Sequence, residues 1–416
     1  MNVTNPITTL KPAASLAFPA ILRKPFLLAC LFLVAFLPLG GSLLRWKGLP
    51  PGYGAFPPPR VAPPPGLDTR YLVVFSLVAL GLCLYLGAPR LFGFKAPVRV
   101  APAKAGPLPA WFAPGVAVMG VSWGLMWFGS GLLARFSFVP LWWGFIYALD
   151  GLVYARTNGR SIVGSRKHEM LILALVSVVG WYLFEYLNYF ALGNWYYPHA
   201  HLLTPFGNVV WYTLSYTTIW PACFEWYMLL MTFPAIRRRW ADGPKIALSR
   251  GLMAASLMTG LALLFLMGRF PYPMFWALWV GSLLVIMGGL KVAGFWTPFD
   301  AMAQGDWSRF SVMALATLLN GLCWEVWNYG SQAFRNGVPS NPNFWGYDVP
   351  YVNVIHLFSE MPLLGYFGYL CFGLLVWVVW VAIAHLVDLE PDFAHQEVMA
   401  AVQAATSSEN LPAKAG

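Results

Sequence analysis

Long apolar runs recur along the chain and are separated by short polar segments. A helix of about 20 apolar residues crosses the hydrocarbon core of a bilayer, and most of these runs approach that length. The pattern predicts an all-α, polytopic integral membrane protein with about ten transmembrane helices. We expect these helices at residues 25–44, 71–87, 111–133, 138–155, 170–191, 209–233, 251–267, 274–290, 310–331 and 354–386.

The segments between and around the runs differ in character. Residues 1–24 are polar and contain proline, and the run after them lacks a small-residue cleavage site, which favours a retained first helix over a signal peptide. Residues 45–70 are rich in proline and predict an extended linker. Pro362 predicts a break within the last run. The tail at 387–416 is short and polar, and we expect it to be disordered.

Composition supports the membrane assignment. The chain is 59% hydrophobic and 10% charged, whereas soluble domains carry about 25% charged residues. The net charge of +10 does not indicate nucleic acid, because most basic residues lie in short loops such as 156–167 and 236–250. This bias predicts that both termini are cytoplasmic in a cell-membrane protein. The proline-rich loop, which is also basic, is the exception.

One local pattern occurs twice. FEYLNY (184–189) and WEVWNY (324–329) both read aromatic, Glu, two residues, Asn, Tyr. The preceding turns RFSFVPLWWG (135–144) and RFPYPMFWAL (269–278) also resemble each other, as do GNWYYP (193–198) and NFWGYDVP (343–350). We therefore expect two helices with the proline-rich loop (25–110), then four-helix units at 111–240 and 241–386. An even number of helices per unit makes this a parallel duplication about an axis along the membrane normal.

The repeated motif supplies the candidate site. Carboxylates inside a membrane helix are expensive and often mark function, so Glu185 and Glu325 are the main candidates, with Glu360 as a third acidic group. Asn188 and Asn328 lie on the same helical faces and are candidates for orienting the carboxylates. The candidate substrate-binding residues are these asparagines together with Tyr189, Tyr329, Trp195, Tyr197, Trp345, Tyr347 and His356. The alternative is structural, in which the polar side chains only join neighbouring helices.

Three functions are compatible with this pattern. A buried glutamic acid beside aromatic walls suits acid chemistry on a hydrophobic lipid or isoprenoid substrate. The same residues suit a proton-coupled secondary transporter, and the third possibility is a membrane scaffold. We expect the lipid bilayer and a hydrophobic small molecule as partners. The histidines and cysteines lack metal-ligand spacing and no nucleotide-binding motif occurs, so we expect no metal, cofactor or nucleic acid.

An acidic residue, then W-x-[FY], then a proline and a carboxylate entering the next helix resembles the integral-membrane lycopene cyclase domains. The matching residues are Glu185, Trp195, Tyr197, Pro221 and Glu225. The resemblance implies duplicated units of three to four helices and an isoprenoid substrate. Those domains carry a Pro-x-Glu-Glu signature, whereas here ACFE follows Pro221, and in the second half Glu360 precedes Pro362.

Overall fold

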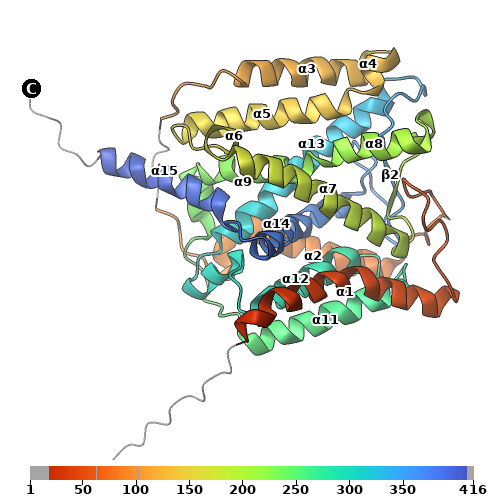
Figure 1. The fold of residues 1–416 in the computed structure, drawn as a ribbon, viewed down its shortest axis with the longest axis horizontal. Helices are drawn as coiled ribbons and strands as arrows, with labels where there is room; N and C mark the ends of the chain where they lie inside the picture. Colours follow the sequence, from red (N-terminus) through yellow and green to blue (C-terminus); the bar gives the residue numbers. More distant parts are fainter. Residues whose placement is uncertain (1–17, 62, 99, 101–103, 410–416) are drawn as a thin grey trace, which may run out of the picture.

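The computed structural model describes residues 18–409, apart from positions 62, 99 and 101–103, as a bundle of helices (Figure 1). Seven helical segments are long and apolar enough to cross a membrane within this part of the chain. They are α1 (Ala20–Trp46), α2 (Thr69–Gly87), α5 (Phe138–Arg156), α7 (Lys167–Phe190), α11 (Arg250–Arg269), α13 (Ser308–Ala333), and the 3-10 helix η5 (Leu363–Phe367) continued by α14 (Gly368–Leu386).

The remaining elements are shorter. Two are apolar helices, α3 (Phe112–Phe128) and α12 (Ala277–Val292). Two are the strands β1 (Trp195–Tyr196) and β2 (Gly346–Tyr347). Short helices form the turns: η1 (Pro89–Phe92), α4 (Gly131–Arg135), α6 (Ile162–Ser165), η2 (Ala200–Leu202), α10 (Pro234–Arg237), η3 (Arg238–Trp240) and η4 (Pro298–Gln304).

The run expected at 209–233 folds as two helices, α8 (Pro205–Tyr216) and α9 (Ile219–Met231), with a break at Thr217 and Thr218. A break exposes backbone N–H groups, which need partners in an apolar environment. The Ser177 hydroxyl oxygen of α7 accepts hydrogen bonds from the N–H groups of Ile219 (3.1 Å) and Trp220 (3.2 Å). Pro221 lies in the first turn of α9, where its missing N–H has no cost. After α9 the chain bends by 95° into α10 and η3.

Close backbone contact holds α1 against α11. A Cβ atom added to Gly41 would lie 2.0 Å from the Phe265 carbonyl oxygen, and one added to Gly268 would lie 1.9 Å from that of Pro38. Only glycine permits this approach, and small residues at helix crossings are typical of membrane bundles. The first helix is therefore packed into the bundle, against α11.

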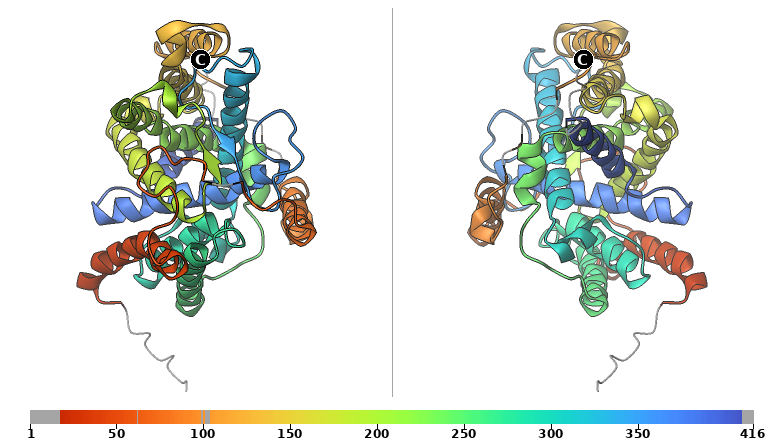
Figure 2. Two further views of the ribbon diagram at one scale, coloured as in Figure 1. Left: turned by 90° about the vertical axis from the view of Figure 1, so that its right-hand side faces the viewer. Right: turned by 90° about the vertical axis from the view of Figure 1, so that its left-hand side faces the viewer.

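In contrast, α2 lies at the flank of the bundle (Figure 2). Ala79 is its only fully buried residue. Its two ends are fixed by specific contacts: the Tyr71 ring stacks on Tyr351 at 4.3 Å, and Arg239 donates to the carbonyl oxygens of Leu86 and Gly87. Contacts at its two ends are therefore the main interactions that hold α2 on the bundle.

The beginning of α1 and the C-terminal elements meet at one end of the bundle (Figure 1). Lys24 and Asp388 form an ion pair of 2.6 Å, which joins the start of α1 to the residues just after α14. Arg166, Arg238, Arg239 and Arg309 belong to the helix ends and turns of the same region. The strands β1 and β2 and the proline-rich loop occupy the opposite end.

Two predictions about the last part of the chain need correction. The run at 354–386 is helical only from Leu363, because Pro362 is the N-cap of η5 and does not lie inside a helix. The tail at 387–416 was expected to be disordered, which is wrong for α15 (Phe393–Glu409). Its apolar residues Phe393 and Val398 are fully buried. Residues 410–416 lie outside the described part.

Ion pairs and ring contacts explain why α15 docks. Glu397 accepts from Arg166 at 2.6 Å, and Asp392 just before the helix accepts from Arg309 at 2.9 Å. The Phe393 ring lies 5.6 Å from Phe224 and 5.3 Å from Trp380. These contacts could not be predicted from the polar composition of the tail, because its partners lie far away in the sequence.

The substitution Phe393→Ala tests this docking. It removes a fully buried ring, and we expect the free energy that holds α15 on the bundle to fall by about 3–5 kcal/mol. Limited proteolysis in detergent should then cleave near residue 390 much faster than in the wild type. The matched change Gln396→Ala, at an exposed position of the same helix, should leave protection unchanged. Equal protection of the Phe393→Ala and wild-type proteins would contradict the assignment.

Candidate functional site

Asn188 and Asn328 hold the loops that follow α7 and α13 back against the bundle. The Asn188 side-chain amide donates to the Trp195 carbonyl oxygen at 2.9 Å, and its oxygen accepts from the Asn194 N–H at 2.8 Å. Asn328 does the same with the carbonyl oxygen (2.8 Å) and N–H (3.1 Å) of Trp345. A carboxamide suits this role because it offers both a donor and an acceptor. Both asparagines are buried.

Glu185 is the centre of a cluster of aromatic donors. Its carboxylate accepts hydrogen bonds from the indole N–H groups of Trp181 (2.9 Å) and Trp195 (3.2 Å). It also accepts from the hydroxyls of Tyr197 and Tyr216, the latter at 3.1 Å. Trp181 lies one helical turn before Glu185 on α7 and so shares its face. The four donors offset the cost of removing the carboxylate from water.

Glu325 repeats the arrangement with fewer donors. Its Oε1 atom accepts from the hydroxyls of Tyr347 and Tyr369, both at 2.7 Å. The indole N–H of Trp345 donates to the Tyr347 hydroxyl oxygen at 2.8 Å instead of to the carboxylate. Each glutamate therefore bonds one tyrosine from its returning loop and one from the following helix. Both carboxylates are buried, with 1% and 0% of each residue exposed.

The two returning loops pair with each other. Strands β1 and β2 are antiparallel, with Trp195 opposite Tyr347 and Tyr196 opposite Gly346. If Trp195 corresponds to Trp345 and Tyr197 to Tyr347, then this register has local two-fold symmetry centred on the Tyr196–Gly346 pair. The loops also contact segments far away in the chain: Asn194 donates to the Phe275 carbonyl oxygen at 3.3 Å, and Asn343 donates to the Ser215 hydroxyl oxygen at 3.1 Å.

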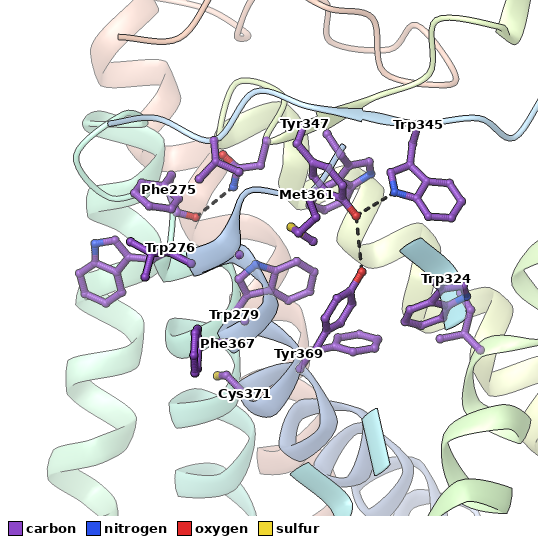
Figure 3. A pocket seen from close by; sticks show the side chains of 18 of the residues that line it. Phe275, Trp276, Trp279, Trp324, Trp345, Tyr347, Met361, Phe367, Tyr369 and Cys371 are labelled. Carbon is purple, nitrogen blue, oxygen red and sulfur yellow. Dashed lines mark hydrogen bonds between the residues drawn. The ribbon is translucent and has the colours of Figure 1, made fainter. Parts of the chain in front are cut away.

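A cavity of about 330 Å³ lies beneath these paired loops and is lined by residues of α2, α7, α8, α12 and α14. Its walls are largely aromatic, and the hydroxyls of Tyr347 and Tyr369 face each other there (Figure 3). One side is formed by a single face of α2, which carries Phe75, Val78, Ala79 and Leu82 at helical spacing. The side chains that donate hydrogen bonds to the two glutamates all line the cavity: Trp181, Trp195, Tyr197, Tyr216, Tyr347 and Tyr369.

The predicted site residues fall into three groups in the structure. Trp195, Tyr197, Trp345 and Tyr347 line the cavity. The two glutamates and two asparagines of the motif lie behind this wall, in contact with it. The remaining predicted residues, which are Tyr189, Tyr329, His356 and Glu360, are not part of the lining. The structure therefore joins the two motif glutamates through one cavity wall but does not bring Glu360 to it.

Several lining residues were not among the predicted site residues. Trp181 carried a usable signal, since it precedes Glu185 by one helical turn. Tyr216 and Tyr369 carried none, because each lies on a different helix from the glutamate it contacts. The contribution of α2 was also hidden, because an apolar helix gives no sign of which face meets a cavity. Asp150 and Glu225 are buried nearer the opposite end and do not line the cavity.

No metal centre is evident in the part of the chain that the structure describes, where no three His, Cys, Asp or Glu side chains are grouped to hold an ion. No protein-family model matches the chain, and no curated protein or solved structure matches it. Function must therefore be argued from the cavity itself.

The loop beside the cavity contains a group that makes stability depend on pH. His199 is buried against the Phe344 ring at 4.8 Å, with its Nδ1 atom 3.2 Å from the Asn341 carbonyl oxygen. Burial lowers the pKa of His199 from its ordinary value of 6.5. Burial likewise lowers the pKa of His395 on α15 to about 3. Both shifts favour the neutral ring in the folded protein.

We therefore expect these two histidines to lower the melting temperature as pH drops from 7.5 to 5.5. The unfolded chain binds more protons than the folded one below the unfolded histidine pKa of about 6.5, so the stability present above that pH is lost on acidification. The substitution His199→Asn should make the loss less steep. His201→Asn, two residues away at an exposed position, should not. Identical pH profiles for His199→Asn and the wild type would contradict this assignment.

Proposed function

We propose that this protein is a multi-pass membrane protein that binds an elongated, lipid-soluble molecule in the cavity between its two helical units. The observation that carries the proposal is a cavity of about 330 Å³ whose aromatic walls hold a few fixed polar atoms. Ligand pockets typically combine apolar walls with a small number of oriented polar groups, and their volumes begin near 300 Å³. Flat aromatic walls suit a lipid or isoprenoid chain with double bonds.

The proposed topology has ten crossings with both termini on the cytoplasmic side of the cell membrane. The seven long apolar segments support this count, together with the helix pair α8–α9 and the shorter helices α3 and α12. The Lys24–Asp388 ion pair supports a common side for the two ends. Basic residues enriched near that end support its cytoplasmic assignment.

We also propose that the two four-helix units arose by parallel duplication. The support is the repeated set of contacts: each motif asparagine binds the backbone of a returning tryptophan, and each motif glutamate binds a returning tyrosine. The two-fold register of β1 and β2 supports an axis along the membrane normal. Such an axis places the cavity where both units contribute to one site.

The flanking position of α2 supports entry of the ligand from the bilayer. Ala79 faces the cavity, whereas Leu80 on the same helix is 54% exposed on the outer side. A bulky side chain at position 79 would fill the space beside Trp276, Trp279 and Val280, which line the cavity from α12 and the residue before it.

The substitution Ala79→Trp should weaken ligand retention by about 1–3 kcal/mol through overpacking. The measurement is mass spectrometry of the apolar extract from purified protein, normalised to protein amount. Leu80→Trp adds the same ring to the lipid-facing side and should retain the ligand. If the wild type carries no apolar molecule, or if both variants retain it equally, the proposed binding site is wrong.

If the cavity supports a reaction, we propose that the glutamates transfer protons to the ligand through tyrosine hydroxyls. Tyr347 and Tyr369 separate Glu325 from the open space and both bond its Oε1 atom. One hydroxyl would donate its proton to a double bond of the ligand, and the protonated Glu325 carboxyl group would return a proton to the phenol. The cation formed on the ligand would be stabilised by the surrounding ring faces. It would then lose a proton from a neighbouring carbon, through the phenol, to the Glu325 carboxylate, which leaves a rearranged double bond and restores the acid.

This enzymatic proposal predicts that Glu325→Gln abolishes product formation while the fold is retained. Loss of a general acid lowers rate by about 10²–10⁴-fold. Untargeted analysis of lipid and pigment extracts from expressing cells measures the product. Glu360→Gln, which changes a glutamate outside the cavity wall, is the matched control and should leave the extract unchanged. An extract that does not depend on expression of the wild-type protein would refute the activity for the host's lipids.

A proton-coupled carrier is the second candidate. The location of the cavity between two parallel units favours it, because many carriers bind substrate at the interface of internal repeats. Uptake into proteoliposomes that depends on a pH gradient, and is lost in Glu325→Gln, would distinguish a carrier from an enzyme. If Glu325→Gln changes the melting temperature but alters neither the lipid extract nor the uptake, the motif has the scaffold role.

A further inference from the structure

A second cavity, of about 420 Å³, lies at the end of the bundle that contains β1 and β2. It is formed by the turn between α3 and α4 and by the loop that follows α13, at residues 334–340. In Figure 1 the α3–α4 turn lies at the upper right, above the end of α13. This cavity shares no lining residue with the aromatic cavity.

Arg335 contributes one positive charge to this cavity. Its guanidinium donates to the Gly129 carbonyl oxygen at 2.7 and 2.8 Å, and to that of Trp127 at 3.4 Å. These bonds satisfy backbone groups at the end of α3. Carbonyl groups carry no net charge, so they leave the cation uncompensated. Burial also lowers the pKa of Arg335 from its ordinary value, because removing the guanidinium from water disfavours its charged form.

Arg135, at the end of α4, contributes a second positive charge. Within the described residues no hydrogen-bond acceptor or carboxylate pairs with its guanidinium. The lining contains no Asp or Glu, although it offers the polar side chains of Ser130, Asn336 and Ser340. Two arginines in the lining of one small cavity that contains no carboxylate offer charged donors to an anion, and guanidinium groups match the oxygens of phosphate.

The side chains at the rim of the cavity indicate which kind of molecule contains the anionic group. Phe128 and Phe334 lie on the rim with ring centroids 5.5 Å apart and are 68% and 50% exposed. Leu132 and Leu133 on α4 are 68% and 72% exposed. Apolar side chains this exposed are suited to contact acyl chains at a membrane interface, whereas a site for a free ion does not need them.

We infer that the Arg135–Arg335 cavity binds the phosphate of an anionic phospholipid headgroup, with the acyl chains lying over Phe128, Phe334 and α4. This site does not depend on the function proposed for the aromatic cavity. Phosphate oxygens accept from both guanidinium groups and from the neighbouring serine and asparagine side chains. The lipid thereby neutralises a pair of cations that the protein itself leaves unpaired.

Native mass spectrometry of the purified full-length protein in detergent tests the site, with phosphatidylglycerol, phosphatidylcholine and inorganic phosphate as separate probes. We expect the wild type to prefer phosphatidylglycerol to phosphatidylcholine. Arg135→Gln should lower its phosphatidylglycerol affinity by about tenfold, as expected for loss of a charged hydrogen bond, and Arg135→Lys should restore most of it. Higher salt should weaken the preference.

Arg269→Gln is the matched control, because Arg269 ends α11 at the same end of the bundle and lines neither cavity. It should bind phosphatidylglycerol like the wild type. Equal affinity of Arg135→Gln and the wild type, or an equal loss in Arg269→Gln, overturns the site. Inorganic phosphate bound as tightly as phosphatidylglycerol, and lost in Arg135→Gln, overturns the lipid as the source of the phosphate.

Discussion

A carboxylate that leaves water must be surrounded by hydrogen-bond donors, and in this protein that requirement organises the site. Among the residues that the structure describes, none forms an ion pair with Glu185 or Glu325, and these two side chains accept hydrogen bonds from indole N–H and phenol O–H groups. The donors to Glu185 come from its own helix, from the loop that follows and from the next helix, whereas those to Glu325 come from the loop and the next helix. Burying each glutamate therefore ties three consecutive segments together. The aromatic rings that supply the donors become the wall of the cavity.

The asparagine of each motif fixes this arrangement by a short-range contact that recurs in both copies. It lies one turn after the glutamate and fixes the backbone of the returning loop at Trp195 or Trp345. The loop is then placed so that its tyrosine, two residues later, reaches the carboxylate. Because both loops return to the same level, their backbones lie side by side and form the β1–β2 pair. The motif thus specifies a loop position as well as a polar contact.

The surroundings of the two glutamates are not equivalent. Glu185 has four aromatic donors, whereas Trp345 turns its N–H to Tyr347 rather than to Glu325. The cavity extends toward α2 and α12, so Tyr347 and Tyr369 face its open space. The two glutamates therefore differ in the number and kind of donors that hold them.

The amino-acid sequence by itself determined the helical class, the approximate helix positions, the paired motifs and four cavity-wall residues, because apolar run length and helical spacing are local properties. Only the tertiary structure decided that the glutamates lie behind the wall, that Glu360 lies outside it, and that α2 closes one side. Likewise α15 folds because Phe393 meets Phe224 and Trp380. Contacts between residues far apart in the chain decide these features, and no local pattern records which distant side chain will supply the partner.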